Sequence, residues 1–497
     1  MSSSPSPDAP PASRSSARAV AVIVVLAFSS LCAALMQSLV IPIQSELPDL
    51  LGTTASNTSW VVTATLLGGG VAMPVTGRLA DLYGKKPVLV VSAAILVVGS
   101  VVCALSDSVG PMIVGRVLQG VAMGYIPVAI SMVRETAPAH LRNTAVAGIS
   151  ATLGVGGALG LPLAAWIAQD FDWHVLFWVS AGLAAVMTVA TLVVVPHVRD
   201  AHPGRLDVVG AIGLAIGLVG VLVGVSKGND WGWDQASTLG MIVGGVLVLL
   251  LWGWYELRHH DPLVDLRTTA RRPVLLTNIA AVLIGFGMMA QSIVVPQLLQ
   301  MPEATGYGLG QTILEAGLWM APAGLMMMAF TPVSSHLLTR LGGRSTMAIG
   351  ATVLALGYVV AVFLMDAPWQ LMLASCVASA GVGIGYAAMP TLILTNVPAT
   401  ESAASVGLNS LMRSIGTTVA GAVMAIVLTS QTTVLAPGTP AIPTGGAFQL
   451  CFVIGAVAAA VGAVIVLFIP RPRGSRPDEG RHLQAVPDAE GDAVLVG

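Results

Sequence analysis

Three charged side chains of this sequence lie inside long apolar segments, and they are the strongest candidates for a chemical role. They are Arg116, Glu315 and Arg413. A charge in such a segment is costly and usually faces a cavity or a partner. Glu315 is the carboxylate best suited to bind a proton. We expect it about one and a half turns inside the outer end of its helix. Its alternative role is that of an acid stabilised by the amino terminus of that helix.

No catalytic constellation accompanies these charges. The sequence has no G-x-S-x-G, no HExxH and no Walker loop, and its glycine-rich run 154–160 lies in an apolar segment rather than after a strand. The four cysteines also fall in apolar segments without metal-ligand spacing, so we expect buried thiols, no disulfide and no metal. The protein is therefore predicted to be no enzyme and to need no cofactor, with a proton gradient as its energy source.

The composition is that of a membrane protein. Of the 497 residues, 55% are hydrophobic and 9% are charged, and the mean hydropathy is +0.85. Soluble domains carry about 25% charged residues. The net charge is −2 and no basic face exists outside the loops, which excludes nucleic acid as a partner.

The apolar segments predict an all-α integral membrane protein with fourteen spanning helices, since roughly 20 apolar residues cross a bilayer. The expected spans are residues 19–44, 58–80, 87–106, 110–133, 143–168, 174–195, 207–226, 237–256, 273–299, 309–336, 344–365, 368–394, 402–430 and 447–470.

These spans divide the chain into two six-helix bundles with two extra helices between them. The extra pair carries no internal charge and is expected at the lipid-facing periphery. Both ends of the chain are polar and are expected to be disordered cytoplasmic tails. The predicted domains are the tail 1–18, the bundle 19–196, the linker 197–206, the extra helices 207–256, the cytoplasmic linker 257–272, the bundle 273–470 and the tail 471–497.

The basic residues predict the orientation of the chain. Most of the 22 Lys and Arg residues fall in the two tails and in alternate connections between spans, as is typical of the cytoplasmic side. We therefore expect a multi-pass protein of the cell membrane with both termini in the cytoplasm. Abundant Ala, Gly and Val indicate a high-GC bacterium and hence the bacterial inner membrane.

The connection between the second and third spans has the most specific pattern of the sequence. Its glycine permits a tight turn, and its aspartate is expected to pair with the cations around it. The connection reads Gly77-Arg78-Leu79-Ala80-Asp81-Leu82-Tyr83-Gly84-Lys85-Lys86-Pro87.

The pattern of this connection repeats later in the chain. Residues 73–86 align without a gap with residues 331–344, so that Gly84 corresponds to Gly342. The repeat predicts parallel six-helix halves related by an axis along the membrane normal.

This connection resembles the signature loop of the major facilitator superfamily of secondary transporters. The resemblance implies a gating loop made by Gly77, Asp81, Gly84, Lys85 and Lys86. Leu82 departs from it, because a basic residue is common there.

The run 116–120 likewise resembles the R-x-x-q-G signature of the fourth helix of that superfamily, which implies a role of Arg116 in proton transfer and packing. The alternative is an arginine that pairs with backbone carbonyl groups.

A narrower resemblance points to the fourteen-helix drug:proton antiporters of this superfamily. Gly156, Gly160 and Pro162 resemble the G-x-x-x-G-P signature of proton-driven exporters, with the proline displaced by one residue. Such a helix can bend, and ordinary glycine packing is the alternative. The segments 59–64, 171–177 and 313–317 also look like that subfamily.

The subfamily often has an arginine at the position of Arg413, on the cytoplasmic half of the thirteenth span. Asp81 is a plausible partner for it across the two halves, and their contact would hold the outward-open state. The alternative is an anchor near the inner interface. Unlike many drug antiporters, this chain has no acid in its first span, 19–44.

The binding surface is expected to be apolar with scattered polar groups. The candidates are Gln37, Gln44, Asn278, Gln291 and Trp319.

These observations predict a proton-coupled exporter of apolar or amphipathic small molecules such as antibiotics. Alternatives are a lipid or lipid-linked molecule translocase of the same fold, a dedicated metabolite exporter, and a non-transporting membrane sensor. The expected partners are the small-molecule substrate, protons and membrane lipids, and the expected oligomeric state is a monomer.

Overall fold

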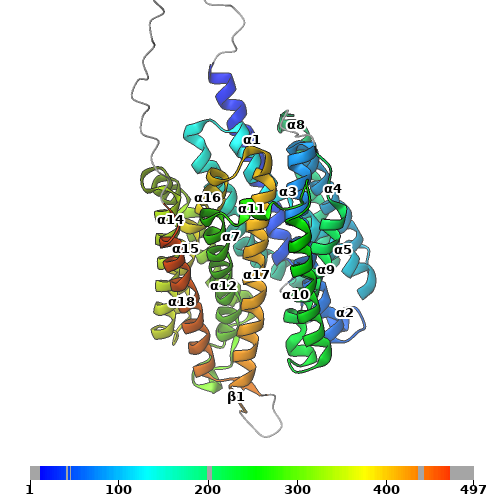
Figure 1. Ribbon diagram of the computed structural model, residues 1–497. Helices are drawn as coiled ribbons and strands as arrows, with labels where there is room; N and C mark the ends of the chain where they lie inside the picture. Colours follow the sequence, from blue (N-terminus) through cyan, green and yellow to red (C-terminus); the bar gives the residue numbers. More distant parts are fainter. Residues whose placement is uncertain (1–11, 41–42, 45, 199–203, 435–440, 471–497) are drawn as a thin grey trace, which may run out of the picture.

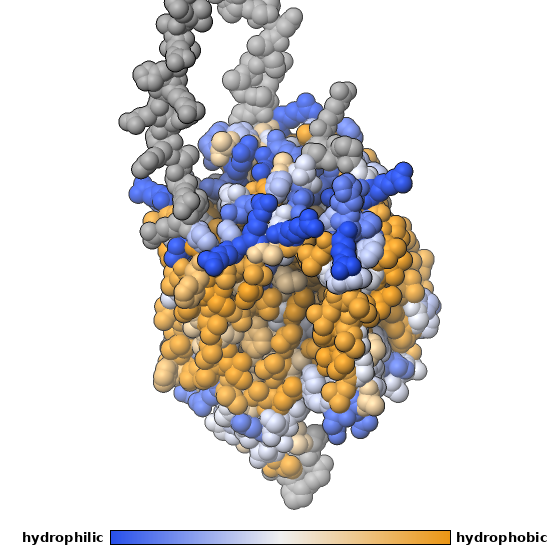
Figure 2. Space-filling view, viewed as in Figure 1, coloured by the Kyte–Doolittle hydropathy of each residue, from blue (hydrophilic) through white to orange (hydrophobic). Residues whose placement is uncertain are grey.

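Long helices run side by side through a band of apolar side chains, with hydrophilic residues gathered at both ends (Figures 1 and 2). The computed structural model describes residues 12–40, 43–44, 46–198, 204–434 and 441–470. We call the side with the Lys- and Arg-rich connections, uppermost in both figures, the inner side.

The described residues are almost wholly helical. In chain order the elements are α1 (Ala12–Ser38), α2 (Leu47–Leu50), α3 (Ala55–Tyr83), α4 (Lys85–Ala104), α5 (Val109–Ala122), α6 (Tyr125–Thr136), α7 (Ala139–Asp170), α8 (His174–Val194), α9 (Val208–Trp231), α10 (Ala236–Glu256), α11 (Leu266–Thr269), α12 (Arg272–Gln300), η1 (Glu303–Thr305), α13 (Ile313–Ala329), α14 (Thr331–Phe363), α15 (Pro368–Tyr386), α16 (Ala388–Asn396), η2 (Ala399–Glu401), α17 (Ser402–Ser430), β1 (Thr432–Thr433), β2 (Ile442–Pro443) and α18 (Gly445–Leu467).

The predicted all-helical membrane fold is confirmed. Within the described ranges, 13 helices are long and apolar enough to cross a membrane. One of them, Ile313–Phe363, has 51 residues and would measure about 75 Å if straight, more than twice the thickness of a bilayer core. It joins α13 to α14, and α14 is itself broken at Gly342. Counting this segment as two crossings gives the fourteen that were predicted.

The internal repeat is visible in the backbone. Gly84 and Gly342, which the alignment makes equivalent, have φ angles of 94° and 77°. Side chains rarely adopt this conformation, so both turns require glycine. The fourth and twelfth spans are interrupted in a similar way, because a short break separates α5 from α6 and α15 from α16.

Each half has its own buried core. One cluster lies mainly among α1 and α3 to α8, and another among α12 to α18. A third and smaller cluster joins α9 to α17 through Leu214, Leu218, Leu408 and Leu411. The two extra helices, α9 and α10, are therefore attached to the bundle through α9.

The two extra helices are not free of charge, because α9 includes Lys227 and α10 ends at the buried Glu256. The predicted span 207–226 ends just before Lys227, whereas α9 extends to Trp231. The Lys227 side chain is 1% exposed, donates to the Ser56 carbonyl at 3.2 Å, and is paired with Asp230 at 3.0 Å. The apolar composition of the segment did not indicate this ion pair of a buried lysine.

The predicted amino-terminal tail is also wrong in part. Residues 12–18 form the start of α1, because the Ser- and Ala-containing run 12–19 continues the apolar helix that follows it. Residues 1–11 and the predicted carboxy-terminal tail lie outside the described residues. So does the middle of the linker 197–206.

Candidate functional site: the inner gate and a lateral groove

Asp81 joins the two halves of the molecule at their inner ends. It lies in the last turn of α3 and is 1% exposed. Its two carboxylate oxygens accept hydrogen bonds from the backbone N–H groups of Ala403, at 3.1 Å, and Ala404, at 2.9 Å. These N–H groups belong to the first turn of α17, where a helix has unpaired donors and a partial positive charge. A carboxylate is therefore well suited to this position.

The two helices joined by Asp81 also touch backbone to backbone. A Cβ on Gly77 would lie 2.4 Å from the Ala403 carbonyl oxygen, and a Cβ on Gly407 would lie 2.3 Å from the Met73 carbonyl oxygen. Both distances are far below van der Waals contact. The helices can approach this closely only because both positions are glycine, one contributed by each half.

Three hydrogen bonds between side chains close the same end of the molecule. Ser131 and Ser402 are 2.8 Å apart, and Thr144 and Ser335 are 2.7 Å apart. Asn143 donates to Thr339 at 3.3 Å. These pairs join α6 to α17 and α7 to α14. We call the Asp81–α17 contact together with these pairs the inner gate, and it is closed in this structure.

The expected pairing of Asp81 with the cations around it is electrostatic, because Lys85 and Arg78 act on its carboxylate while the two lysines contact other groups. Lys85 is buried and forms an ion pair with Glu135 at the end of α6. Lys86 donates to the Leu192 carbonyl in the last turn of α8, at 2.9 Å. Both lysines therefore attach the loop to its own half, and Asp81 is left to reach the other half. Glu135 was missed because nothing in the sequence relates it to a loop fifty residues earlier.

Arg413 does not contact Asp81, and the predicted pair is wrong. Its guanidinium lies over the Tyr386 ring, 4.5 Å from the centroid. Arg413 follows Ala403 by almost three helical turns, or about 15 Å. The partner of Asp81 is instead the amino terminus of α17. Pro398, just before the thirteenth span, is the sequence signal that could have indicated this helix start.

Arg116 pairs with a backbone carbonyl group, as in the alternative role given for it. It is 2% exposed, and its Nε donates to the Val61 carbonyl of α3 at 3.0 Å. Its Nη1 donates to Gln119 at 2.9 Å, and Gln119 in turn donates to Ser100 of α4 at 3.0 Å. Arg116 thereby connects α3, α4 and α5 around a buried polar network.

Glu315 lies at a helix start and not one and a half turns inside it. It is exposed in the first turn of α13, where its carboxylate accepts from the Thr312 backbone N–H at 2.9 Å. The Thr312 hydroxyl also accepts from the Glu315 backbone N–H at 3.2 Å. This reciprocal pair is a capping box. Glu315 therefore has the geometry of an acid stabilised by the amino terminus of its own helix, which was its alternative role.

The three residues of the helix-bending motif lie on an uninterrupted helix. α7 runs from Ala139 to Asp170 through Pro162. A Cβ on Gly156 would lie 2.7 Å from the Ala34 Cβ, so α7 packs closely on α1 at this point. Gly160 is buried one turn further along the same helix.

The polar residues expected in the cavity lie in separate places. Asn278 of α12 accepts from Asn409 of α17 at 2.9 Å. Trp319 donates to Gln311 at 2.9 Å. Gln37 is half-buried near the end of α1, and Gln44, the last residue of the predicted span 19–44, is exposed in a turn because α1 ends at Ser38.

Gln291, the fifth of these residues, bonds within its own half. Its backbone N–H donates to the Tyr358 hydroxyl at 2.9 Å, and its side chain donates to the Ser375 carbonyl at 3.4 Å. It therefore joins α12 to α14 and α15.

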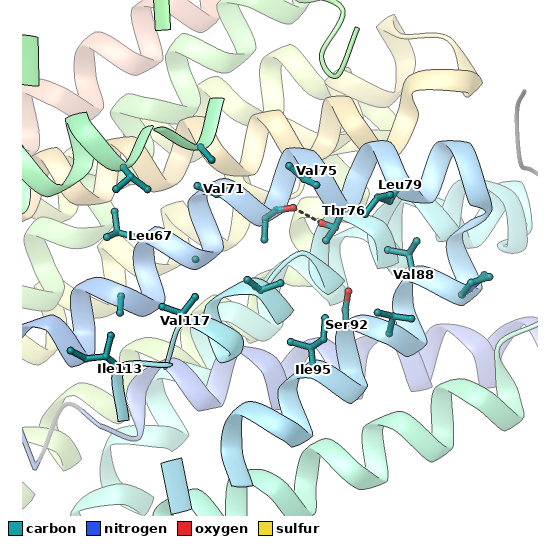
Figure 3. Close-up of a pocket in the computed structure, with 18 of the residues that line it drawn as sticks. Leu67, Val71, Val75, Thr76, Leu79, Val88, Ser92, Ile95, Ile113 and Val117 are labelled. Carbon is teal, nitrogen blue, oxygen red and sulfur yellow. Dashed lines mark hydrogen bonds between the residues drawn. The ribbon is translucent and has the colours of Figure 1, made fainter. Parts of the chain in front are cut away.

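A long apolar groove opens on the lipid-facing side between α3, α4, α5 and α9. Its volume is about 780 Å³. In Figure 3, side chains of α3 such as Leu67, Val71 and Val75 face Val88 of α4 and Val117 of α5 across it. The lining extends along α3 from residue 60 to residue 83, about 35 Å, which is enough to cross a bilayer core.

The groove has few polar side chains, and some of their donors are engaged within their own helix. Thr76, for example, donates to the Ala72 carbonyl at 2.7 Å, the bond drawn in Figure 3. Ser92 is the neighbouring hydroxyl on α4. The groove fits a flexible apolar chain better than a polar solute.

Comparisons with known proteins agree with this architecture. The model of the Major Facilitator Superfamily matches residues 26–421 and 277–493. An uncharacterized MFS-type transporter of Bacillus subtilis (strain 168), YhcA, is 22% identical over 417 residues, which cover 83% of this chain and 77% of that protein.

Some relatives are named for drug resistance. The multidrug resistance protein B homolog of Mycobacterium tuberculosis (strain ATCC 25618 / H37Rv) is 28% identical over 393 residues, covering 76% of this chain and 71% of the relative. The crystal structure of the human organic anion transporter MFSD10 superposes with a TM-score of 0.63 at 15% identity, covering 92% of this chain and 100% of that one. At this identity the likeness concerns the fold alone.

Proposed function

The chain belongs to the Major Facilitator Superfamily, and we propose that it is a proton-coupled exporter of apolar or amphipathic small molecules, of the fourteen-helix drug:proton antiporter kind. It works in a bacterial cell membrane with the inner side facing the cytoplasm. The observation that carries the proposal is the closed inner gate, in which Asp81 of one half binds the first turn of α17 in the other.

The gate gives the protein two alternative states. Transporters of this architecture expose a central site to one side at a time as their halves rock against each other. The contact between Asp81 and α17 can exist only while the inner ends are together. Breaking this contact opens the cytoplasmic side for substrate entry. Forming it again closes that side, so that the substrate is released on the outer side.

The contact has the strength expected of a gate and not of a permanent joint. Hydrogen bonds to a charged group contribute about 1.5–3 kcal/mol each, and the helix amino terminus adds up to about 2 kcal/mol. Binding of a substrate or a proton can supply energies of this size, so the equilibrium between the two states can be moved.

The direction and energy source of transport rest on two further observations. Relatives that carry the name multidrug resistance protein match most of the chain. The sequence has no Walker loop, which leaves an ion gradient to drive export.

Dye efflux from energised cells tests the proposal. Cells that produce the protein should lose an apolar dye faster than control cells, and a protonophore should abolish the difference. Asp81→Asn should abolish efflux while the amount of protein in the membrane is unchanged. Asp366→Asn, which neutralises an exposed carboxylate elsewhere, is the matched control and should leave efflux intact. Efflux that persists in Asp81→Asn would contradict the gating role.

The lateral groove favours a second candidate function, translocation of a lipid or lipid-linked molecule. A groove of about 780 Å³ that crosses the apolar band would hold an acyl or polyprenyl chain while a head group moves through the protein. Val71→Trp should block such transport by filling the groove. Labelled lipid that changes leaflet in vesicles containing the protein, without any dye efflux in cells, would favour this function over drug export.

A further inference from the structure

We propose that Asp207 and Glu256 form a proton-binding site at the inner end of the α9–α10 hairpin, and that its occupancy is linked to the inner gate. Asp207 is the residue that precedes α9, and Glu256 is the last residue of α10. Proton binding itself is independent of the proposed function, whereas its link to alternating access rests on that function.

The two carboxyl groups are buried side by side. Asp207 is 6% exposed and Glu256 is 2% exposed. A Cβ on Gly210 would lie 2.4 Å from Asp207 Oδ2 and 2.5 Å from Glu256 Oε1. The two oxygens are therefore at most about 5 Å apart, within the distance at which one carboxylate disfavours ionisation of another.

Partners for two negative charges are missing from the described surroundings. Asp207 Oδ1 accepts from the Gly210 N–H at 2.8 Å and from the Tyr255 hydroxyl at 3.2 Å. Asp207 Oδ2 and both Glu256 oxygens accept no hydrogen bond from any described residue. The backbone N–H groups of Leu263 and Val264 and the indole N–H of Trp252 are turned toward Glu256, but none of them closes a regular hydrogen bond with it.

Of the cations nearby, Arg258 and Arg267 are engaged elsewhere, and Arg205, two residues before Asp207, is exposed. The one ion pair that the described residues offer either carboxylate is with His259, whose Nε2 is 4.0 Å from Asp207 Oδ2. Arg258 lies over the Trp254 ring, 4.1 Å from its centroid. Arg267 donates to the Leu257 carbonyl at 3.1 Å. A small polar cavity beside Leu263 and Val264 is lined by further charged and titratable groups, which are Arg78, His260, Asp261, Asp265 and Glu401.

A single proton resolves this arrangement. Two buried carboxylates this close, with His259 as the one ion-pair partner among the described residues, disfavour the doubly ionised state. One proton taken from water makes one of them neutral. The new O–H group can then donate to the other carboxylate. The pair takes up and releases this proton as a unit, so the titration belongs to both residues together.

The site is mechanically connected to the gate. Leu263 and Val264, which follow Glu256 in the connection between α10 and α12, are 1% and 3% exposed and pack against Leu408 and Leu411 of α17. α17 is the helix whose first turn binds Asp81. The same connection meets Arg78 of α3 and Glu401 around a cavity of about 190 Å³.

Occupancy of the site therefore favours one state of the transporter. With the proton bound, the connection packs on α17 and the inner gate stays closed. With both carboxylates ionised, their repulsion drives the hairpin end and the connection apart and loosens α17. By linkage, a closed gate binds the proton more tightly, and a fall in cytoplasmic pH favours closure.

Infrared spectroscopy of the purified protein in liposomes tests the proton site without any substrate. We expect a protonated-carboxyl band that titrates across the neutral pH range in the wild-type protein. Glu256→Gln and Asp207→Asn should each remove it, and asparagine should preserve the helix cap at position 207. Glu46→Gln, at an exposed acid near the other end of the molecule, should leave the band unchanged. A band that survives both substitutions would overturn the proposal.

Cysteine cross-linking tests the link to the gate. Cysteines at Asn143 and Thr339, whose side chains meet across the closed gate at 3.3 Å, are introduced after the four native cysteines are replaced. Cross-linking should fall several-fold as the pH rises, and Glu256→Gln should keep it high at every pH. Equal pH dependence in both proteins would refute the link. If the carboxyl band and the pH-dependent cross-link are both found but cells producing the protein show no dye efflux, the proposed function is refuted and the proton site stands.

Discussion

Asp81 and Ala404 are separated by 323 positions in the sequence and joined by a 2.9 Å hydrogen bond. The carboxylate at the end of α3 meets the first turn of α17, so the end of one repeat is bound by a helix of the other. The contact combines a charge, a helix terminus and a backbone-to-backbone approach through glycine. A contact of this kind is strong when the helices are aligned and is lost entirely when they separate.

Gly407→Ala should prevent the inner gate from closing. The added Cβ would lie 2.3 Å from the Met73 carbonyl oxygen, a backbone atom that cannot move aside without moving α3. We expect at least a tenfold loss of efflux and a matching loss of the 143–339 cross-link. Gly421→Ala is the control on the same helix, because its Cβ would meet only the Ile293 side chain at 3.8 Å. Normal efflux by Gly407→Ala would show that the close approach is unnecessary.

Lys85→Met should destabilise the protein by leaving Glu135 without its cation. Lys85 is 1% exposed and Glu135 is 21% exposed, and removing one partner of a buried ion pair costs about 3–5 kcal/mol. The thermal unfolding temperature in detergent measures the effect. The double variant Lys85→Met/Glu135→Gln should recover most of the loss. A double variant as unstable as the single one would mean that the pair itself is not the cause.

Glu315→Gln should leave both efflux and its sensitivity to a protonophore unchanged. Glutamine can occupy the same position of a capping box, so the start of α13 should be preserved. Glu315→Ala should lower stability through loss of the capping box. An efflux defect in Glu315→Gln at normal protein levels would restore Glu315 as a proton-coupling residue.

Arg413→Ala should leave the inner gate closed. The guanidinium lies over Tyr386 and not on Asp81, so the cross-link between cysteines at 143 and 339 should form as in the parent protein. Asp81→Asn in the same background should reduce it by about tenfold, if neutralising the carboxylate removes about 1.4 kcal/mol. Equal loss in both variants would indicate that Arg413 supports the gate after all.

The fold was largely predictable because membrane crossing imposes simple rules on sequence. Span length, the distribution of Lys and Arg, and the repeated loop gave the helices and the two halves. The equivalence of Gly84 and Gly342 followed from alignment alone, and both have the positive φ that the turn requires.

The site was less predictable because its contacts join distant residues through features that sequence does not display. Asp81 was identified, but its partner is a pair of backbone N–H groups, which any residue would provide. Charges at the ends of predicted spans were misjudged as well. Lys227 and Glu256 are buried because helices pack around them, whereas hydropathy treated them as boundaries. The amides expected to share a cavity instead bond to neighbouring helices, as Asn278 does with Asn409.

The most direct test of the whole account is transport by the purified protein in liposomes with an imposed proton gradient. A pH-sensitive dye on the side opposite the substrate reports proton movement. We predict that adding substrate to the wild-type protein dissipates the gradient, that the gradient drives substrate accumulation, and that Asp81→Asn does neither. Substrate movement that proceeds equally without a proton gradient, or that survives in Asp81→Asn, would contradict a proton-coupled exporter gated by Asp81.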